Sequence, residues 1–236
     1  MARKKRLYMP GMTYHIIQRG NNDGQCFYNE DCYRFYLYCL KDALRIYRGN
    51  LHAYVLIQNL VNLLLTPESA EAIPLIMKVV GSRYTLYVNG NFQRTGTLWD
   101  GRYKASLVCA DTHLLLCHRY IESLPVKRGL VNHPGEYSWS SYSSNAFADK
   151  KGLVTPHSIY HNLGTNIGTR CAAYRELLLK LPEKELDEFQ KSLLKGHLLG
   201  SNEFRHEVEK MLGCSLGYAR CGRPRKTSND NRLSSI

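Results

Sequence analysis

The spacing of apolar residues constrains the fold of this chain more than any other feature. Apolar and β-branched runs predict strands, whereas apolar residues at three- and four-residue intervals predict helices. The patterns come in the order strand, helix, strand, strand, helix, strand, and one further helix follows. The predicted strands cover 13–18, 52–57, 61–66 and 103–108, and the predicted helices cover 29–47, 73–87 and 111–123.

Local signals set the ends of these elements. Asn29 is the expected N-cap of the first helix, and Pro125 is expected to stop the helix that begins at Asp111. The order of the elements predicts an α+β fold, a ferredoxin-like antiparallel sheet with helices on one face. We expect this domain to occupy 1–150, a small helical region 151–214 (with helices at 170–181, 183–195 and 202–212), and a basic, disordered tail 215–236.

Composition excludes several classes of protein. No segment has 18 uninterrupted apolar residues, and no apolar run follows the basic start, so we expect neither a membrane span nor a secretory signal, and a cytoplasmic location. The eight cysteines form no Cys-x-x-Cys pair, which argues against zinc. The net charge of +12 is spread over both halves of the chain. Such an excess favours a polyanion partner, although a basic protein without one fits equally well.

Five short motifs together are more specific than the charge. They are Gln18–Asn22, His52–Leu56, Arg94–Lys104, Arg119–Glu122 and Trp139–Tyr142. In this order and at these distances, the set resembles the REP-associated tyrosine transposases, which belong to the single-tyrosine, His-hydrophobic-His superfamily. The resemblance covers roughly residues 5–165 and implies a ferredoxin-like fold. It also implies cleavage of single-stranded DNA near a palindromic hairpin, through a 5′-phosphotyrosine link.

The resemblance also implies a divalent metal, held by two histidines on a strand and one polar side chain on the tyrosine helix. This chain has Leu60 and Asn62 at the histidine positions and Leu124 at the third. Leucine has no donor atom, and one amide oxygen does not hold a hard cation. We therefore expect no metal and no other cofactor. Tyr120 remains at the nucleophile position, where it is either idle, as a half-buried aromatic, or the attacking group.

Residues that could contact DNA are better preserved. Arg94, Arg102 and Lys104 flank Trp99, which could stack on an unpaired base or, equally, belong to the core.

Two further segments carry donors. Arg19, Asn21 and Asn22 lie in a predicted turn, where they could bind phosphate or base edges or serve turn chemistry alone. Arg223 and Arg225 form a partial AT-hook pattern in the tail, for which a solvated basic tail is the plainer interpretation.

The sequence thus predicts a DNA-binding protein of this family that recognises single-stranded or hairpin DNA and is catalytically impaired. The alternative is an active transposase that uses Mg²⁺ or Mn²⁺ for single-strand nicking and joining. A third class, an RNA-binding module, suits the fold and charge but lacks the paired aromatics of the common RNA-recognition strands. The oligomeric state is left open.

Overall fold

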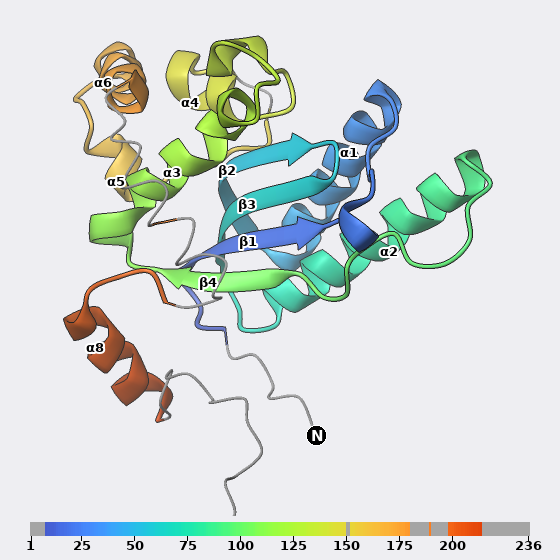
Figure 1. The fold of residues 1–236 in the computed structure, drawn as a ribbon. Helices are drawn as coiled ribbons and strands as arrows, with labels where there is room; N and C mark the ends of the chain where they lie inside the picture. The colour runs from blue at the N-terminus through green and yellow to red at the C-terminus, as the bar shows by residue number, and fades with distance from the viewer. Residues whose placement is uncertain (1–7, 150–151, 180–188, 190–197, 214–236) are drawn as a thin grey trace, which may run out of the picture.

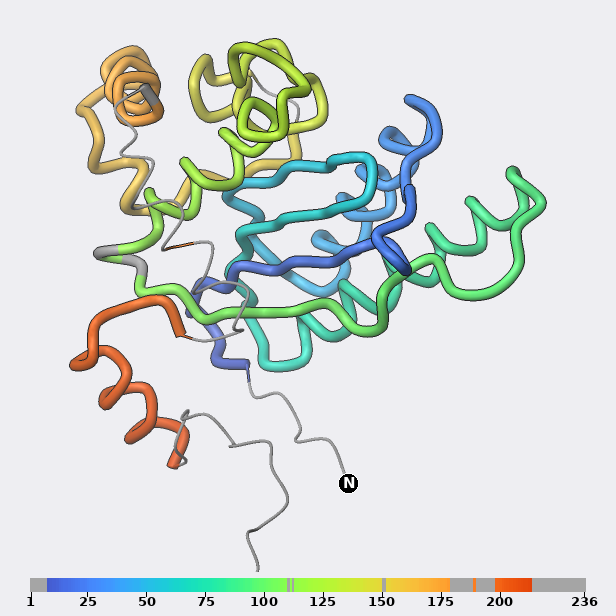
Figure 2. Tube along the Cα trace, viewed as in Figure 1, coloured from blue at the N-terminus to red at the C-terminus, as the bar shows by residue number. Residues whose placement is uncertain are grey.

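The computed structural model describes residues 8–149, 152–179, 189 and 198–213 (Figure 1, Figure 2). The strands in these ranges are β1 (Thr13–Arg19), β2 (Gly49–Ile57), β3 (Leu60–Pro67) and β4 (Lys104–Val108). The helices are α1 (Glu30–Tyr47), α2 (Ala72–Asn91), α3 (Ala110–Lys127), α4 (Tyr142–Phe147), α5 (Ser158–His161), α6 (Ile167–Leu179) and α8 (Asn202–Leu212), with short 3-10 turns η1 (Asn21–Asp23) and η2 (Pro134–Glu136). The predicted order of strands and helices is confirmed.

The strands form one antiparallel sheet in the order β2-β3-β1-β4. β1 lies between β3 and β4, with Tyr14 opposite Leu65 on one side and opposite Leu107 on the other. A sheet of this order, with α1 between β1 and β2 and α2 between β3 and β4, is ferredoxin-like. The predicted α+β fold is therefore confirmed.

The two faces of the sheet carry different helices. α1 and α2 pack together on one face, as predicted, and α3 packs on the other (Figure 1). Because side chains alternate along a strand, Tyr14 and Ile16 enter the core under α1 and α2, whereas Ile17 enters the core under α3. The sheet therefore has a hydrophobic core on each of its faces, and a third, smaller cluster lies within the helical region.

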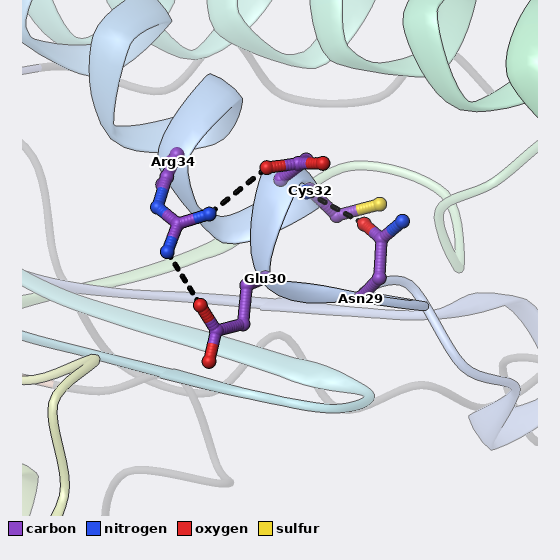
Figure 3. Close-up of polar contacts among 5 residues, drawn as sticks. Asn29, Glu30, Cys32 and Arg34 are labelled. Carbon is purple, nitrogen blue, oxygen red and sulfur yellow. Dashed lines mark hydrogen bonds and ion pairs between the residues drawn. The ribbon is translucent and has the colours of Figure 1, made fainter.

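Asn29 starts α1 in the way that the sequence predicts. Its side chain accepts a hydrogen bond from the backbone N–H of Cys32 at 3.1 Å (Figure 3). One turn further on, Arg34 pairs with Glu30 at 2.5 Å and with Asp31 at 2.9 Å. The positive charge of Arg34 is therefore matched locally, and this helix end does not offer a free cationic surface.

The predicted stop at Pro125 is wrong, because α3 continues to Lys127 with Pro125 inside it. Proline lacks the N–H that would bond four residues back, a small loss in the last turn of a helix, where the following carbonyl groups find other partners. Arg128 N–H donates to Leu124 O, and Leu130 N–H donates to Pro125 O.

α5 and α6 of the helical region pack against α3. α6 and α8 correspond to the predicted helices 170–181 and 202–212, whereas most of 183–195 and all of 215–236 lie outside the described residues. Leu199 forms a parallel bridge with Val108 and so extends the sheet beside β4. Among the helices that the structure describes, none has the length and apolar character needed to span a bilayer.

Candidate nucleic-acid interface and tyrosine site

Tyr120 lies on the side of α3 that faces the sheet. Its side chain is only 4% exposed and packs in the same core as Leu60 of β3 and Leu124 of α3. The rings of His15 and Phe189 approach it edge-on, with centroids 5.9 Å and 5.5 Å away. The residue at the expected nucleophile position is thus brought to the altered ligand positions, inside an apolar environment.

His15, which the sequence did not single out, occupies the centre of this site. Its Nε2 lies 3.0 Å from Oδ1 of Asn62, on the neighbouring strand. Burial lowers the pKa of His15 to about 3, and the hydrogen bond to Asn62 offsets only part of that, so the ring is neutral. Because an amide oxygen can only accept, Nε2 carries the proton and donates it. One hydrogen bond therefore joins the two polar side chains of the site, whereas Nδ1 of His15 and Nδ2 of Asn62 have no partner among the described residues.

The residues present do not fit a divalent cation. The oxygen of Asn62 is engaged by His15, and the Nδ2 atom of Asn62 is a donor that cannot bind a metal. Nδ1 of His15 is the one nitrogen acceptor left, and Leu60 and Leu124 contribute only carbon. Within the described ranges, no three His, Cys, Asp or Glu side chains gather where they could hold an ion.

Two other histidines, His52 and His118, have hydrogen-bond partners elsewhere. His52 bonds through Nδ1 to the carbonyl oxygen of Thr155 and through Nε2 to Thr66. His118 points to the helical region, where its Nδ1 contacts the hydroxyl of Tyr174. Neither of these two rings has a contact with Asn62 among the described residues, so neither histidine replaces the lost pair.

Two cations lie near Tyr120 at one end of the sheet. Arg19 ends β1, and Arg128 follows α3, where its guanidinium donates to Oδ1 of Asn59 at 3.2 Å. Burial raises the pKa of the Tyr120 hydroxyl, and the nearby charges of Arg128 and Arg19 offset part of that rise. Asn21 and Asn22 lie in η1, directly after Arg19, and Asn22 is exposed in a left-handed conformation.

A backbone latch, made of main-chain hydrogen bonds around Gly20, joins the end of β1 to the segment before β4. Gly20 forms a bridge with Trp99, and its N–H donates to the carbonyl oxygen of Asn59. On either side, Asn21 N–H donates to Leu98 O and Asp100 N–H donates to Arg19 O, each at 2.9 Å. A Cβ atom at position 20 would lie 1.9 Å from Gly24 O, so only glycine fits here.

Trp99 is a core residue, which is the second of the two interpretations that the sequence allows. The indole is 6% exposed and packs against Tyr84 and Tyr36 at 5.8 and 6.3 Å between centroids. It reaches solvent only at the floor of a cleft of about 960 Å³ between α2, β1 and the segment before β4. Gln18, also in this floor, is 7% exposed, and its Oε1 has no partner among the described residues.

The basic residues around Trp99 separate into two groups. Arg102 lines the cleft and is exposed, and Lys104 on β4 is also exposed. Lys78 of α2 is a further cation that lines the cleft, and the sequence analysis did not single it out. Arg94 instead packs inward, with its guanidinium 5.7 Å from the ring of Tyr28. Arg223 and Arg225 lie outside the described residues.

Comparisons with known proteins agree with this geometry. A family model described as "Transposase IS200 like" matches residues 8–124, from the segment before β1 to Leu124 of α3. A solved REP-associated tyrosine transposase bound to a REP hairpin has a TM-score of 0.54 and 17% identity, over 66% of this chain and 89% of that chain. It shares the fold.

A second solved structure, from Deinococcus radiodurans R1 and assigned as a transposase, has a TM-score of 0.36 and 22% identity, over 49% of this chain and 92% of that chain. No curated protein matches the chain. On the match to the family model, the chain belongs to the IS200-like transposase family.

Proposed function

We propose that this chain is a cytoplasmic DNA-binding member of the family that recognises single-stranded or hairpin DNA and no longer cuts it. The observation that carries the proposal is the His15–Asn62 hydrogen bond, which lies beneath Tyr120 with Leu60 and Leu124 in the same core. A divalent ion typically supplies several kcal/mol of transition-state stabilisation in such chemistry. Since each 1.36 kcal/mol is a factor of about ten in rate, its loss reduces nicking by several orders of magnitude.

The cations near Tyr120 and the cleft support DNA as the ligand. Arg19 and Arg128 lie near Tyr120, whereas Lys78, Arg102 and Lys104 lie at or beside the cleft. The related transposase that shares the fold is bound to a REP hairpin, which makes a hairpin the first ligand to try. In the cleft, the unpartnered amide oxygen of Gln18 would receive a donor from an unpaired base.

Binding is tested with the double variant Arg102→Ala/Lys104→Ala and a fluorescent single-stranded hairpin, titrated at several salt concentrations. Each lost phosphate contact lowers the slope of log K against log salt by roughly 0.7 to 0.9, so the pair should lower it by about 1.4 to 1.8. The control is Arg34→Ala/Arg45→Ala, which removes two exposed cations of α1 that are paired with acidic neighbours. An equal change in both variants would remove the cleft from the proposal.

Loss of chemistry is tested by incubating the wild-type protein with the hairpin and Mg²⁺ or Mn²⁺, then searching for a covalent protein–DNA adduct. No adduct is expected. An adduct that disappears in Tyr120→Phe and in chelator would instead establish the alternative, a working metal-dependent transposase. The retained position of Tyr120, between Arg19 and Arg128 and on the side of the sheet that carries Asn62, is the observation that favours that alternative.

An RNA ligand is distinguished by competition. If an RNA hairpin of the same sequence displaces the DNA hairpin at an equal or lower concentration, the protein is an RNA-binding module, and the DNA proposal fails.

A further inference from the structure

Glu122 lies in a fully buried polar cluster on the side of α3 that faces the helical region. Its Oε1 accepts hydrogen bonds from the hydroxyl of Ser141 at 2.5 Å and from the amide of Asn145 at 2.8 Å. Its Oε2 lies 2.7 Å from the hydroxyl of Tyr174, on α6. One carboxyl group thus connects α3, the start of α4 and α6.

The contacts continue beyond Tyr174. The same hydroxyl lies 3.1 Å from Nδ1 of His118, and Nε2 of His118 is buried without a partner among the described residues. His52 is different, because the carbonyl oxygen of Thr155 fixes the proton on its Nδ1. At His118, the hydroxyl of Tyr174 is the closer contact of Nδ1 and the amide of Asn145 lies 3.5 Å away, so no carbonyl oxygen among the described residues fixes the proton of this ring.

We propose that Glu122, Tyr174 and His118 form a reversible hydrogen-bond relay, in which loss of the carboxyl proton reverses both hydrogen bonds and changes the tautomer of the neutral imidazole. With Glu122 protonated, its O–H donates to the oxygen of Tyr174, and Tyr174 donates to the bare Nδ1 of His118. With Glu122 ionised, Nδ1–H donates to Tyr174, and Tyr174 donates to the carboxylate.

The protons balance in this change. The carboxyl proton moves to the oxygen of Tyr174, the tyrosine proton moves to Nδ1 of His118, and Nε2 of His118 releases its own proton to water. One proton leaves the cluster, and the imidazole is neutral at both ends. Ser141 and Asn145 donate to the other carboxyl oxygen in both states, because neither bond needs to reverse.

The surrounding ionisable groups do not compete with this change near neutral pH. The tyrosines that face the cluster are Tyr54 on β2, Tyr142 on α4 and Tyr160 on α5, and burial raises the pKa of each. The histidines are His52 on β2 and His157 before α5, and burial lowers the pKa of both. The charged groups are Arg175 on α6, which donates to Ala146 O, and Asp149 after α4, which faces Tyr54.

The pKa values of the relay itself agree with the geometry. Burial raises the pKa of Glu122 to about 7, and the bonds from Ser141, Tyr174 and Asn145 offset only part of that rise. Burial lowers the pKa of His118 to about 3, so this ring is neutral over the whole range in which Glu122 titrates. The hydrogen bonds between the sheet domain and the helical region therefore change with pH, and the change does not bury a new cation.

The test is ¹⁵N NMR of the histidine rings in the full chain between pH 5 and pH 9. The His118 signals are expected to change from the Nε2–H to the Nδ1–H tautomer, with a midpoint at about 7. Glu122→Gln should keep the Nε2–H tautomer throughout, since its amide donates to Tyr174 as the acid does. Tyr174→Phe should uncouple His118 from the carboxyl group. His52 is the internal control and should not change.

Three results would overturn the relay. The first is one unchanged tautomer of His118 in the wild type, and the second is the same pH-dependent change in Glu122→Gln. The third is an imidazolium, with both ring nitrogens protonated, anywhere between pH 5 and pH 9.

Discussion

The two sides of α3 show how a helix treats buried polarity. On the side facing the sheet, Cys117, Ile121 and Leu124 surround Tyr120, and the polar contact beside it is the His15–Asn62 pair across two strands. On the side facing the helical region, Glu122 is just as deeply buried, yet each of its oxygens has a donor. Polar groups are kept in a core where partners satisfy them, whereas positions without partners are filled by apolar side chains.

The largest effect that would distinguish the two sides is expected from Glu122→Ala. This change removes the carboxyl group as acceptor for the hydroxyls of Ser141 and Tyr174 and for the amide of Asn145, and each lost hydrogen bond to a charged group costs about 1.5–3 kcal/mol. We expect the free energy of unfolding to fall by roughly 3 kcal/mol or more in urea titrations. A loss below about 1 kcal/mol would mean that water replaces the carboxylate and that the outer side of α3 is less dry than described.

The pH dependence of stability sharpens the same point. The pKa of Glu122 is raised in the folded protein from 4.5 to about 7, so its contribution is complete below pH 4.5 and is lost as the pH rises through 7. Buried histidines with lowered pKa values act in the opposite direction, losing stability as the pH falls below 6.5. The difference in unfolding free energy between wild type and Glu122→Gln isolates the first effect.

The difference in unfolding free energy between wild type and Glu122→Gln should decrease by on the order of 3 kcal/mol between pH 5 and pH 8. A constant difference over that range would place the titration of Glu122 outside it.

On the inner side, restoring the family pattern with Leu60→His, Asn62→His and Leu124→Asn should destabilise the protein by roughly 2 kcal/mol without metal, since polar groups then enter an apolar core unpaired. Thermal unfolding with and without Mn²⁺ measures this. Stabilisation of the variant alone by the ion would show that a metal site has been rebuilt. If the variant is as stable as wild type without metal, the inner side is not as apolar as its contacts indicate.

The smallest effect is expected from Tyr120→Phe. No hydrogen bond of its hydroxyl is found among the described residues, and the ring keeps its edge contacts with His15 and Phe189. The free energy of unfolding should change by about 0.5 kcal/mol or less, the usual range for a change that breaks no specific contact. A loss well above that value would reveal a partner of the hydroxyl and give Tyr120 a structural role.

Sequence patterns predicted the fold well because its signals are local. The capping residue Asn29 and the apolar run 61–66 determine elements without reference to the rest of the chain. The helix end predicted at Pro125 was wrong because a proline in the last turn destabilises a helix less than a proline in its middle. Trp99 was ambiguous because its neighbours Tyr36 and Tyr84 come from distant helices.

The candidate site was less predictable for a related reason. Tyr120, Leu60 and Asn62 were found by their position in a motif, but His15 lies 47 residues before Asn62 and meets it only through the pairing of β1 with β3. The register of two paired strands depends on both segments at once. A pattern within one segment therefore does not indicate that His15 lies beside Asn62. The partners of Glu122 on α4 and α6 were hidden for the same reason.

The backbone latch at Gly20 has a consequence for how force and motion pass through the molecule. The strand end with Arg19, the β2–β3 tip with Asn59 and the wall of the cleft at Trp99 are bonded to one another through main-chain atoms. Main-chain links of this kind do not loosen when a side chain changes rotamer. A displacement of the strand end at Arg19 is therefore passed through main-chain bonds to Trp99 in the cleft, and the two places act as a single stiff element.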